Sequence, residues 1–115
     1  MTRTNLMKRK IFFFLTIIIA SAGVGFAADA AALWGQHCAS CHGKDGSGST
    51  MMGKKLGVKD YHDAKVQAAF SDAEAARAIK EGVKTSGKET MKPFGSKLSD
   101  ADIKALVAYV RSFKK

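Results

Sequence analysis

The stretch "CASCHG", residues 38–43, contains both cysteines of the 115-residue chain and one of its three histidines. Cys38 and Cys41 are three positions apart, and residues at that spacing share one face of a helix. Both sulfur atoms should therefore emerge on the same side, with the imidazole of His42 about 100° further round the helix. A disulfide between the two cysteines would close a tiny loop, stabilise the fold weakly and leave His42 without a role.

The pattern C-x-x-C-H is the attachment motif of c-type haem. In such a site two thioether bonds, here from Cys38 and Cys41, hold the haem, and His42 becomes the proximal iron ligand. Two alternatives use the same residues. A thioredoxin-like C-x-x-C opens a helix after a strand, whereas this motif ends a predicted helix. A zinc site needs four ligands, and only His37 or His62 could complete the set. We therefore favour haem.

The N-terminus has the layout of a secretory signal peptide. Four positively charged residues precede the apolar run "IFFFLTIIIA" at 11–20, and a segment rich in small residues follows it. We expect a signal peptide over residues 1–27, with cleavage after Ala27 or one residue later, and one domain over residues 28–115. Export would place that domain in the periplasm, outside the cytoplasm, where c-type haem is attached. An uncleaved membrane anchor is the alternative, because the apolar stretch approaches the length that spans a bilayer.

Charge and size narrow the class of protein further. The formal net charge of +9 includes the four leader cations, which leaves +5 on the predicted domain. Its lysines are interleaved with acidic residues and form no compact basic run beside aromatic residues, so we expect no nucleic-acid partner. A basic surface of this kind favours partners with acidic patches. A domain of this size is small for a core made of side chains alone, and such domains often recruit a cofactor.

The hydrophobic pattern predicts an all-α domain with three main helices, short helical turns and long loops. The first main helix covers residues 29–42 with Asp29 as its N-cap, the second follows a Ser71/Glu74 capping box, and the last follows a Ser99/Asp102 capping box. Residues 43–55 are predicted to be a glycine-rich loop, a short helix is expected near 63–69, and residues 83–98 are predicted to be irregular, with no strand pairs. Five apolar residues between the first two main helices are expected to line a pocket: Leu56, Val58, Tyr61, Val66 and Phe70. Loops of this length suggest that something other than side chains fills the middle of the domain.

Two segments resemble class I monohaem c-type cytochromes, and the likeness extends over essentially the whole predicted domain. They are "ALWGQHCASCHGKDGSG" at 32–48 and "ETMKPFGSKLSDADIKALVAYV" at 89–110. The resemblance implies a small cytochrome c-like fold wrapped around one covalent haem c, in which Met91 is the distal iron ligand. It also implies that the first and last helices cross and place Ala30 and Trp34 against Leu106 and Tyr109.

The sequence departs from the family pattern in two places. Lys92 separates Met91 from Pro93, whereas the family often has proline directly after the methionine. Many members also have a proline after the glycine-rich loop, whose neighbouring carbonyl steadies the proximal histidine, and this chain has none there. The carbonyl that orients His42 therefore stays open, although some hydrogen-bond acceptor is expected.

The residues themselves also favour Met91 as the sixth ligand. It lies in a polar stretch beside a rigid proline, where a methionine is poorly explained as core filling. Met51 and Met52 follow His42 too closely to reach the opposite face of the haem easily, and we interpret them as flexible core fillers. His62 is the alternative ligand, and His37 is expected at the surface.

Ligation of iron by His42 and Met91 would fill both axial positions and raise the reduction potential. The sequence therefore predicts a one-electron carrier rather than an enzyme, monomeric, which docks on acidic patches of larger periplasmic or membrane-bound oxidoreductases. Two alternatives remain: a haem sensor or catalytic domain with an exchangeable sixth ligand, and a membrane-tethered subunit of a respiratory complex that retains its leader.

Overall fold

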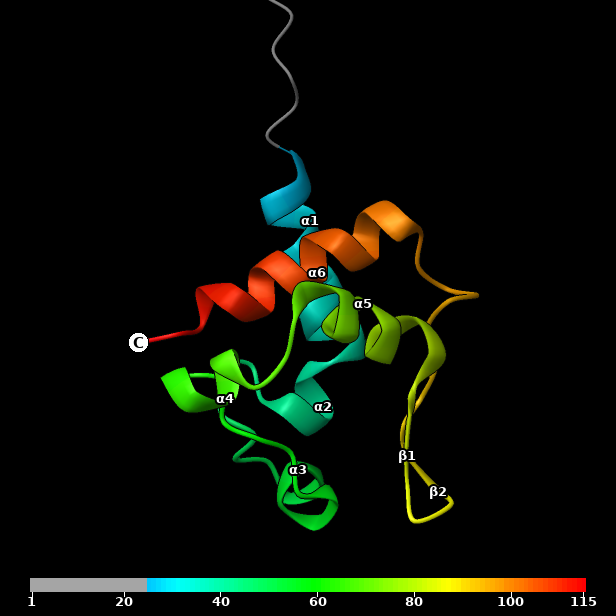
Figure 1. The fold of residues 1–115 in the computed structure, drawn as a ribbon. Coiled ribbons are helices and arrows are strands. Elements are labelled where there is room, and N and C mark those ends of the chain that lie inside the picture. Colours follow the sequence, from blue (N-terminus) through cyan, green and yellow to red (C-terminus); the bar gives the residue numbers. More distant parts are fainter. Residues whose placement is uncertain (1–24) are drawn as a thin grey trace, which may run out of the picture.

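The computed structural model of the protein describes residues 25–115 (Figure 1). Most of the predicted signal peptide lies outside the described residues, so the boundary between residues 27 and 28 stays a prediction. Within the part of the chain that is described, no helix combines the length and the hydropathy needed to cross a membrane.

Helices dominate the described chain, and a small hairpin is added to them. The helices are α1 (Gly25–His37), α2 (Ala39–His42), α3 (Met51–Leu56), α4 (Ala64–Ala68), α5 (Asp72–Glu81) and α6 (Asp100–Ser112); the strands are β1 (Val83–Thr85) and β2 (Lys88–Met91). The three longest helices, α1, α5 and α6, correspond to the three main helices expected from the sequence. The mostly helical architecture with three main helices is therefore confirmed.

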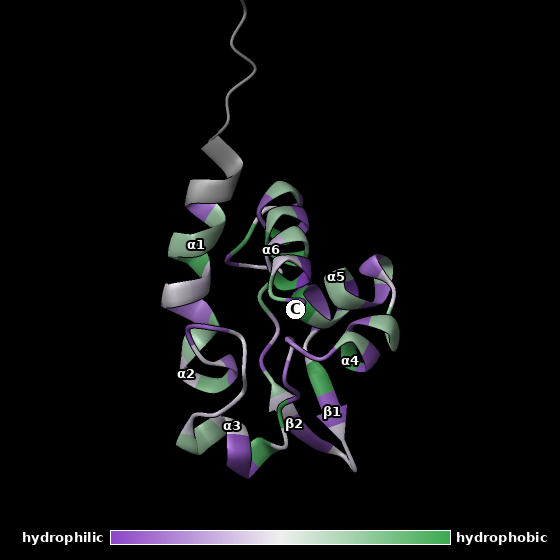
Figure 2. Cartoon of the chain, turned by 90° about the vertical axis from the view of Figure 1, so that its left-hand side faces the viewer, coloured by the Kyte–Doolittle hydropathy of each residue, from purple (hydrophilic) through white to green (hydrophobic). Residues whose placement is uncertain are grey.

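The core forms where α1 crosses α6 (Figure 1). Trp34 on α1 is 3% exposed and Leu106 on α6 is fully buried. The Trp34 ring also packs against Tyr109, with 5.8 Å between ring centroids, as the family resemblance implied. Figure 2 shows hydrophobic residues beside hydrophilic ones along α6, as expected for a helix that buries one face.

Local sequence signals set the ends of α5 and α6. At both N-termini the predicted capping boxes are complete: Ser71 and Glu74 exchange side-chain and backbone hydrogen bonds, and Ser99 and Asp102 do the same. Each box satisfies two backbone N–H groups that a helix start leaves free. Gly82 ends α5 with φ of +77°, which a residue with a Cβ adopts only with strain.

The first predicted helix differs from the structure at both ends. It begins at Gly25 instead of after Asp29, so Asp29 is an interior helical residue and not the N-cap. At Cys38 the backbone turns to φ −118° and ψ −35°, which separates α1 from α2. The two cysteines therefore do not lie on one continuous helix: Cys38 lies at the break and Cys41 lies within α2.

Two segments predicted to be loops contain regular structure. Thr50 caps α3 by accepting a hydrogen bond from the backbone N–H of Gly53, so the glycine-rich segment is not wholly a loop. The expectation of no strand pairs was also wrong, because β1 and β2 form an antiparallel hairpin. Its turn contains Ser86 at φ +52° and Gly87 at φ +78°, the left-handed pair that suits a tight hairpin turn.

Candidate cofactor-binding site

Three of the four predicted site residues line one cavity of about 310 Å³. Cys38 comes from the break between α1 and α2, His42 from the end of α2, and Met91 from the end of β2. Apart from Glu74, the other lining residues are apolar or aromatic: Trp34, Tyr61, Phe70, Ala75, Ala78, Ile79, Leu106 and Val110. A mostly apolar hollow with a few convergent donor atoms is typical of a cofactor site.

The two cysteines are free thiols in different surroundings. Cys38 is 8% exposed, whereas Cys41 is half-buried and is not among the residues that line the cavity. Burial, with a smaller contribution from the neighbouring Cys41, raises the pKa of the Cys38 thiol to about 11. A thioredoxin-like pair needs a thiol with a lowered pKa, so the raised pKa argues against that alternative.

The surroundings of the motif also count against zinc. Within residues 25–115, no three side chains of the His, Cys, Asp or Glu type lie close enough together to hold a metal ion. A structural zinc site needs four such ligands around one ion.

His42 lies between two aromatic rings. Its imidazole is stacked on Tyr61, with 5.5 Å between centroids and 19° between planes, and Trp34 lies 5.4 Å away on a tilted plane. Burial lowers the pKa of His42, so the imidazole is neutral at pH 7, as a metal ligand must be. Its Nδ1 is buried and has no hydrogen-bond partner among the described residues. The hydrogen-bond acceptor expected for His42 is therefore not found among the described residues. Buried polar atoms are rarely left unpaired, and an unpaired one fits a side chain that serves a bound group.

The backbone on either side of His42 is fixed by three hydrogen bonds from outside α2. Thr50 Oγ1 donates to the carbonyl of Cys41 at 2.9 Å, and Trp34 Nε1 donates to the carbonyl of Gly43 at 2.9 Å. The N–H of Gly48 donates to the carbonyl of His42 itself at 2.7 Å. The sequence reasoning missed Thr50, although a threonine three residues before Gly53 has the spacing of an N-cap.

Met91 is half-buried and packs against the hydrophobic core. The hairpin passes close to α5, because a Cβ on Gly82 would lie 2.6 Å from the Met91 carbonyl oxygen. Just beyond the hairpin, the N–H of Phe94 donates to the carbonyl of Ile79 at 2.9 Å. These contacts hold the methionine segment on α5 and keep its side chain at the cavity.

The other candidate ligands lie away from the cavity. Met51 is 90% exposed and Met52 is 47% exposed, so their interpretation as core fillers was wrong. His62 pairs with Asp60, with 3.0 Å between Nδ1 and Oδ1, and does not line the cavity. His37 was expected at the surface but is half-buried with its ring edge-on to Phe94.

The pocket predicted from the apolar residues between the first two main helices is only partly right. Tyr61 and Phe70 line the cavity, whereas Leu56, Val58 and Val66 do not. Helices α5 and α6 supply the rest of the wall, through residues such as Ile79, Leu106 and Val110. Those residues belong to ordinary amphipathic helices, so only the packing of the helices reveals their role.

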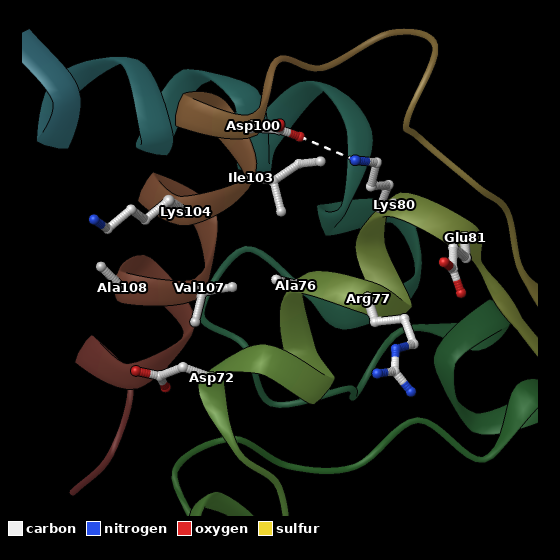
Figure 3. Close-up of a pocket in the computed structure, with 10 residues that line it drawn as sticks. All are labelled: Asp72, Ala76, Arg77, Lys80, Glu81, Asp100, Ile103, Lys104, Val107 and Ala108. Atoms are coloured by element: carbon white, nitrogen blue, oxygen red, sulfur yellow. Dashed lines mark hydrogen bonds and ion pairs between the residues drawn. The ribbon is translucent and has the colours of Figure 1, made fainter.

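A second, more open groove lies between α5 and α6 (Figure 3). Its volume of about 590 Å³ is larger, but its lining includes none of the four predicted site residues. Its apolar floor is bordered by charged side chains, among them Lys80 and Asp100, which form an ion pair at 3.3 Å. The groove is therefore separate from the site that carries the motif.

Known proteins resemble this chain along most of its length. Residues 25–110 match the protein-family model described as cytochrome C oxidase, cbb3-type, subunit III. Cytochrome c-554(547) of Halothiobacillus neapolitanus is 34% identical over 91 residues, which is 76% of this chain and 100% of that protein. Cytochrome c6 of Picosynechococcus sp. is 34% identical over 116 residues, with 90% of this chain and 92% of that protein covered.

A solved structure is similar too. The KustC0563 c-type cytochrome superposes with a TM-score of 0.68 at 43% identity, over 75% of this chain and 98% of that chain. The site fits the covalent haem of such proteins in three ways. Cys38 and Cys41 are free thiols, the neutral imidazole of His42 has an unpaired Nδ1, and the cavity has mostly apolar walls. The chain therefore belongs to the family described as cytochrome C oxidase, cbb3-type, subunit III, and is a small monohaem c-type cytochrome with a covalently attached haem.

Proposed function

We propose that this cytochrome is a one-electron carrier in which Cys38 and Cys41 form the two thioether bonds, and His42 and Met91 are the axial ligands of the haem iron. One observation carries the proposal: Cys38, His42 and Met91 come from separate parts of the chain and line the same apolar cavity. Met91 and His42 are 49 residues apart in sequence, and they line one cavity because the segment that carries Met91 lies against the end of α5.

The chain's own residues explain why such a site would carry electrons and do little else. When bound, the haem supplies an iron that exchanges one electron. The soft thioether of Met91 would favour ferrous iron and raise the reduction potential. With both axial positions filled by side chains, a substrate could reach the iron only by displacing one of them.

We propose docking on acidic surfaces of redox partner proteins. Several lysines of α3, of the hairpin and directly after it are exposed and form no ion pair within the described residues: Lys54, Lys55, Lys84, Lys88 and Lys92. Such charges speed encounter with acidic partners at low salt. The rate of electron transfer to an acidic partner should fall steeply between low and high ionic strength, and a rate that salt leaves unchanged would count against this docking mode.

Visible spectra of the exported protein test the ligand set. The oxidised protein should give a low-spin c-type spectrum with the far-red sulfur-to-iron band. Met91→Ala should lose that band, whereas the matched variant Met51→Ala, at a side chain 90% exposed, should keep it. A band that survives in Met91→Ala would overturn the proposed distal ligand.

A second candidate function is supported by the position of Met91 at the base of an exposed hairpin. All three residues of β1 are exposed, as is Lys92 beyond β2, so the segment that carries Met91 faces solvent on the side away from α5. A haem sensor or catalytic domain could exchange its sixth ligand at such a solvent-facing segment. Rapid carbon monoxide binding by the reduced protein would favour that function, and slow binding would favour the carrier.

We further propose that the carrier is periplasmic and monomeric, with residues 1–27 removed. Mass spectrometry of the protein from a soluble extract should give an N-terminus at Ala28 or Asp29. An intact N-terminus in the membrane fraction would instead identify a tethered subunit.

A further inference from the structure

Gln67 on α4 is the one buried polar or charged residue among residues 29–115, with 4% of its surface exposed. Its Nε2 donates two hydrogen bonds of 2.8 Å, one to the carbonyl of Tyr61 and one to the carbonyl of Val110. A single amide thereby joins the segment before α4 to the last turns of α6, 43 residues further along the chain.

Arg111 on α6 completes this arrangement. Its Nη1 donates to the Gln67 Oε1 at 3.1 Å and also to the Gln67 carbonyl, and its Nη2 donates to the carbonyl of Phe70 at 2.8 Å. The guanidinium also lies 4.3 Å from the centroid of the Phe70 ring, and Nε donates to Asp72 at 2.8 Å. The planar, forked guanidinium makes all these contacts at once, which a lysine ammonium cannot do.

The residues tied by this pair have one property in common. Tyr61, Phe70 and Val110 all line the cavity that contains the predicted haem ligands, whereas Gln67 and Arg111 do not line it. The Tyr61 ring is stacked on His42, and the Phe70 ring meets Tyr61 edge-on at 6.0 Å. Tyr61 and Phe70 form an aromatic wall of the cavity, and the position of this wall therefore depends on Gln67 and Arg111, which lie behind it.

We propose that Gln67 and Arg111 are positioning residues that hold this aromatic wall against the haem and so set its reduction potential. The proposal rests on the proposed function, because it takes the cavity as the haem site. Ferric haem carries one positive charge more than ferrous haem, so a loosened wall that admits water favours the ferric form and lowers the potential.

Two variants test the proposal, each with a matched control. Gln67→Met removes the amide with little change of length, and Arg111→Lys keeps the charge but removes the fork. The controls are Gln36→Met on α1 and Arg77→Lys on α5, the same chemical changes at exposed positions. The midpoint potential, the thermal midpoint and the amide hydrogen exchange of residues 61–70 are measured for all four and for the wild type.

We expect Gln67→Met and Arg111→Lys to shift the redox equilibrium several-fold towards the ferric form; a tenfold shift corresponds to about 59 mV for one electron. In both variants the backbone amides of residues 61–70 should also exchange hydrogen faster than in the wild type. The reason is that Gln67 and Arg111 donate hydrogen bonds to the carbonyls of Tyr61 and Phe70. The two control variants should match the wild type in both measurements.

A lower thermal midpoint with unchanged potential would show a structural role alone and overturn the proposal. So would a wild-type potential and exchange pattern in Arg111→Lys, because charge would then suffice. The far-red band of the wild type tests the proposed function separately, because its absence would refute Met91 as the distal ligand. The reduction potential and the amide hydrogen exchange of residues 61–70 would still decide the role of Gln67 and Arg111.

Discussion

Gly53 on α3 is the position where a single methyl group should disturb the motif most directly. A Cβ there would lie 2.2 Å from the carbonyl oxygen of Cys41 and 2.5 Å from that of Gly48. Real Cβ atoms essentially never come within 3.0 Å of such atoms, so Gly53→Ala must move α3 and the Cys41 carbonyl apart by at least about 0.8 Å. Both obstacles are backbone atoms, which cannot rotate away.

The structure allows the cost to be estimated. Overpacking a closely packed contact costs about 1–3 kcal/mol, and stretching the hydrogen bond from Thr50 to the Cys41 carbonyl costs about 1 kcal/mol more. Replacing glycine inside a helix by alanine returns about 1 kcal/mol. We therefore expect Gly53→Ala to lower the free energy of unfolding by about 2 kcal/mol.

Urea unfolding followed by circular dichroism measures this loss, with Gly35→Ala as the matched control. Gly35 lies within α1, and no atom lies within 4 Å of the Cβ it would gain, so this variant should be more stable than the wild type by about 0.5–1 kcal/mol. If Gly53→Ala gains stability as the control does, α3 cannot lie against the Cys41 carbonyl as described.

Three further predictions concern single contacts. Trp34→Phe removes the hydrogen bond to the buried carbonyl of Gly43 and should cost about 1–3 kcal/mol in urea unfolding; an unchanged midpoint would contradict it. Ser99→Ala removes one half of the α6 capping box and should cost about 1 kcal/mol, seen as a lower thermal midpoint that Ser99→Asp largely restores. Hydrogen bonds from Ser47 lower the pKa of Asp45 below its ordinary value of 3.8. The stability that this carboxylate contributes is therefore present above pH 3.8 and is lost as the pH falls through the lowered pKa. Ser47→Ala should raise the pKa of Asp45 in an NMR titration, and an unchanged pKa would refute this.

Some elements were predictable because their signals are local. The capping boxes at Ser71 and Ser99 each lie within four residues of sequence, and the apolar spacing that follows Ser99 defines the buried face of α6. Each signal is written within one or two turns, so a helix start can be read without knowledge of the fold.

Other elements carry signals too weak to read. The strands β1 and β2 have three and four residues and are mostly exposed, so they show no alternation of buried and exposed positions. Only the Ser86–Gly87 turn marks the hairpin, and a Ser-Gly pair is as frequent in loops. Likewise, nothing in the sequence marks the break at Cys38, because the residues around it are compatible with a continuous helix.

The sequence by itself determined the chemistry of the cofactor, because Cys38, Cys41 and His42 are neighbours and their spacing does not depend on the fold. Only the tertiary structure decided what surrounds that chemistry. Met91 reaches the cavity because β2 packs beside α5, and the wall depends on Gln67 and Arg111, which are 44 residues apart. Contacts between distant residues arise from the burial of whole helix faces, and no local pattern encodes which distant partner each side chain meets.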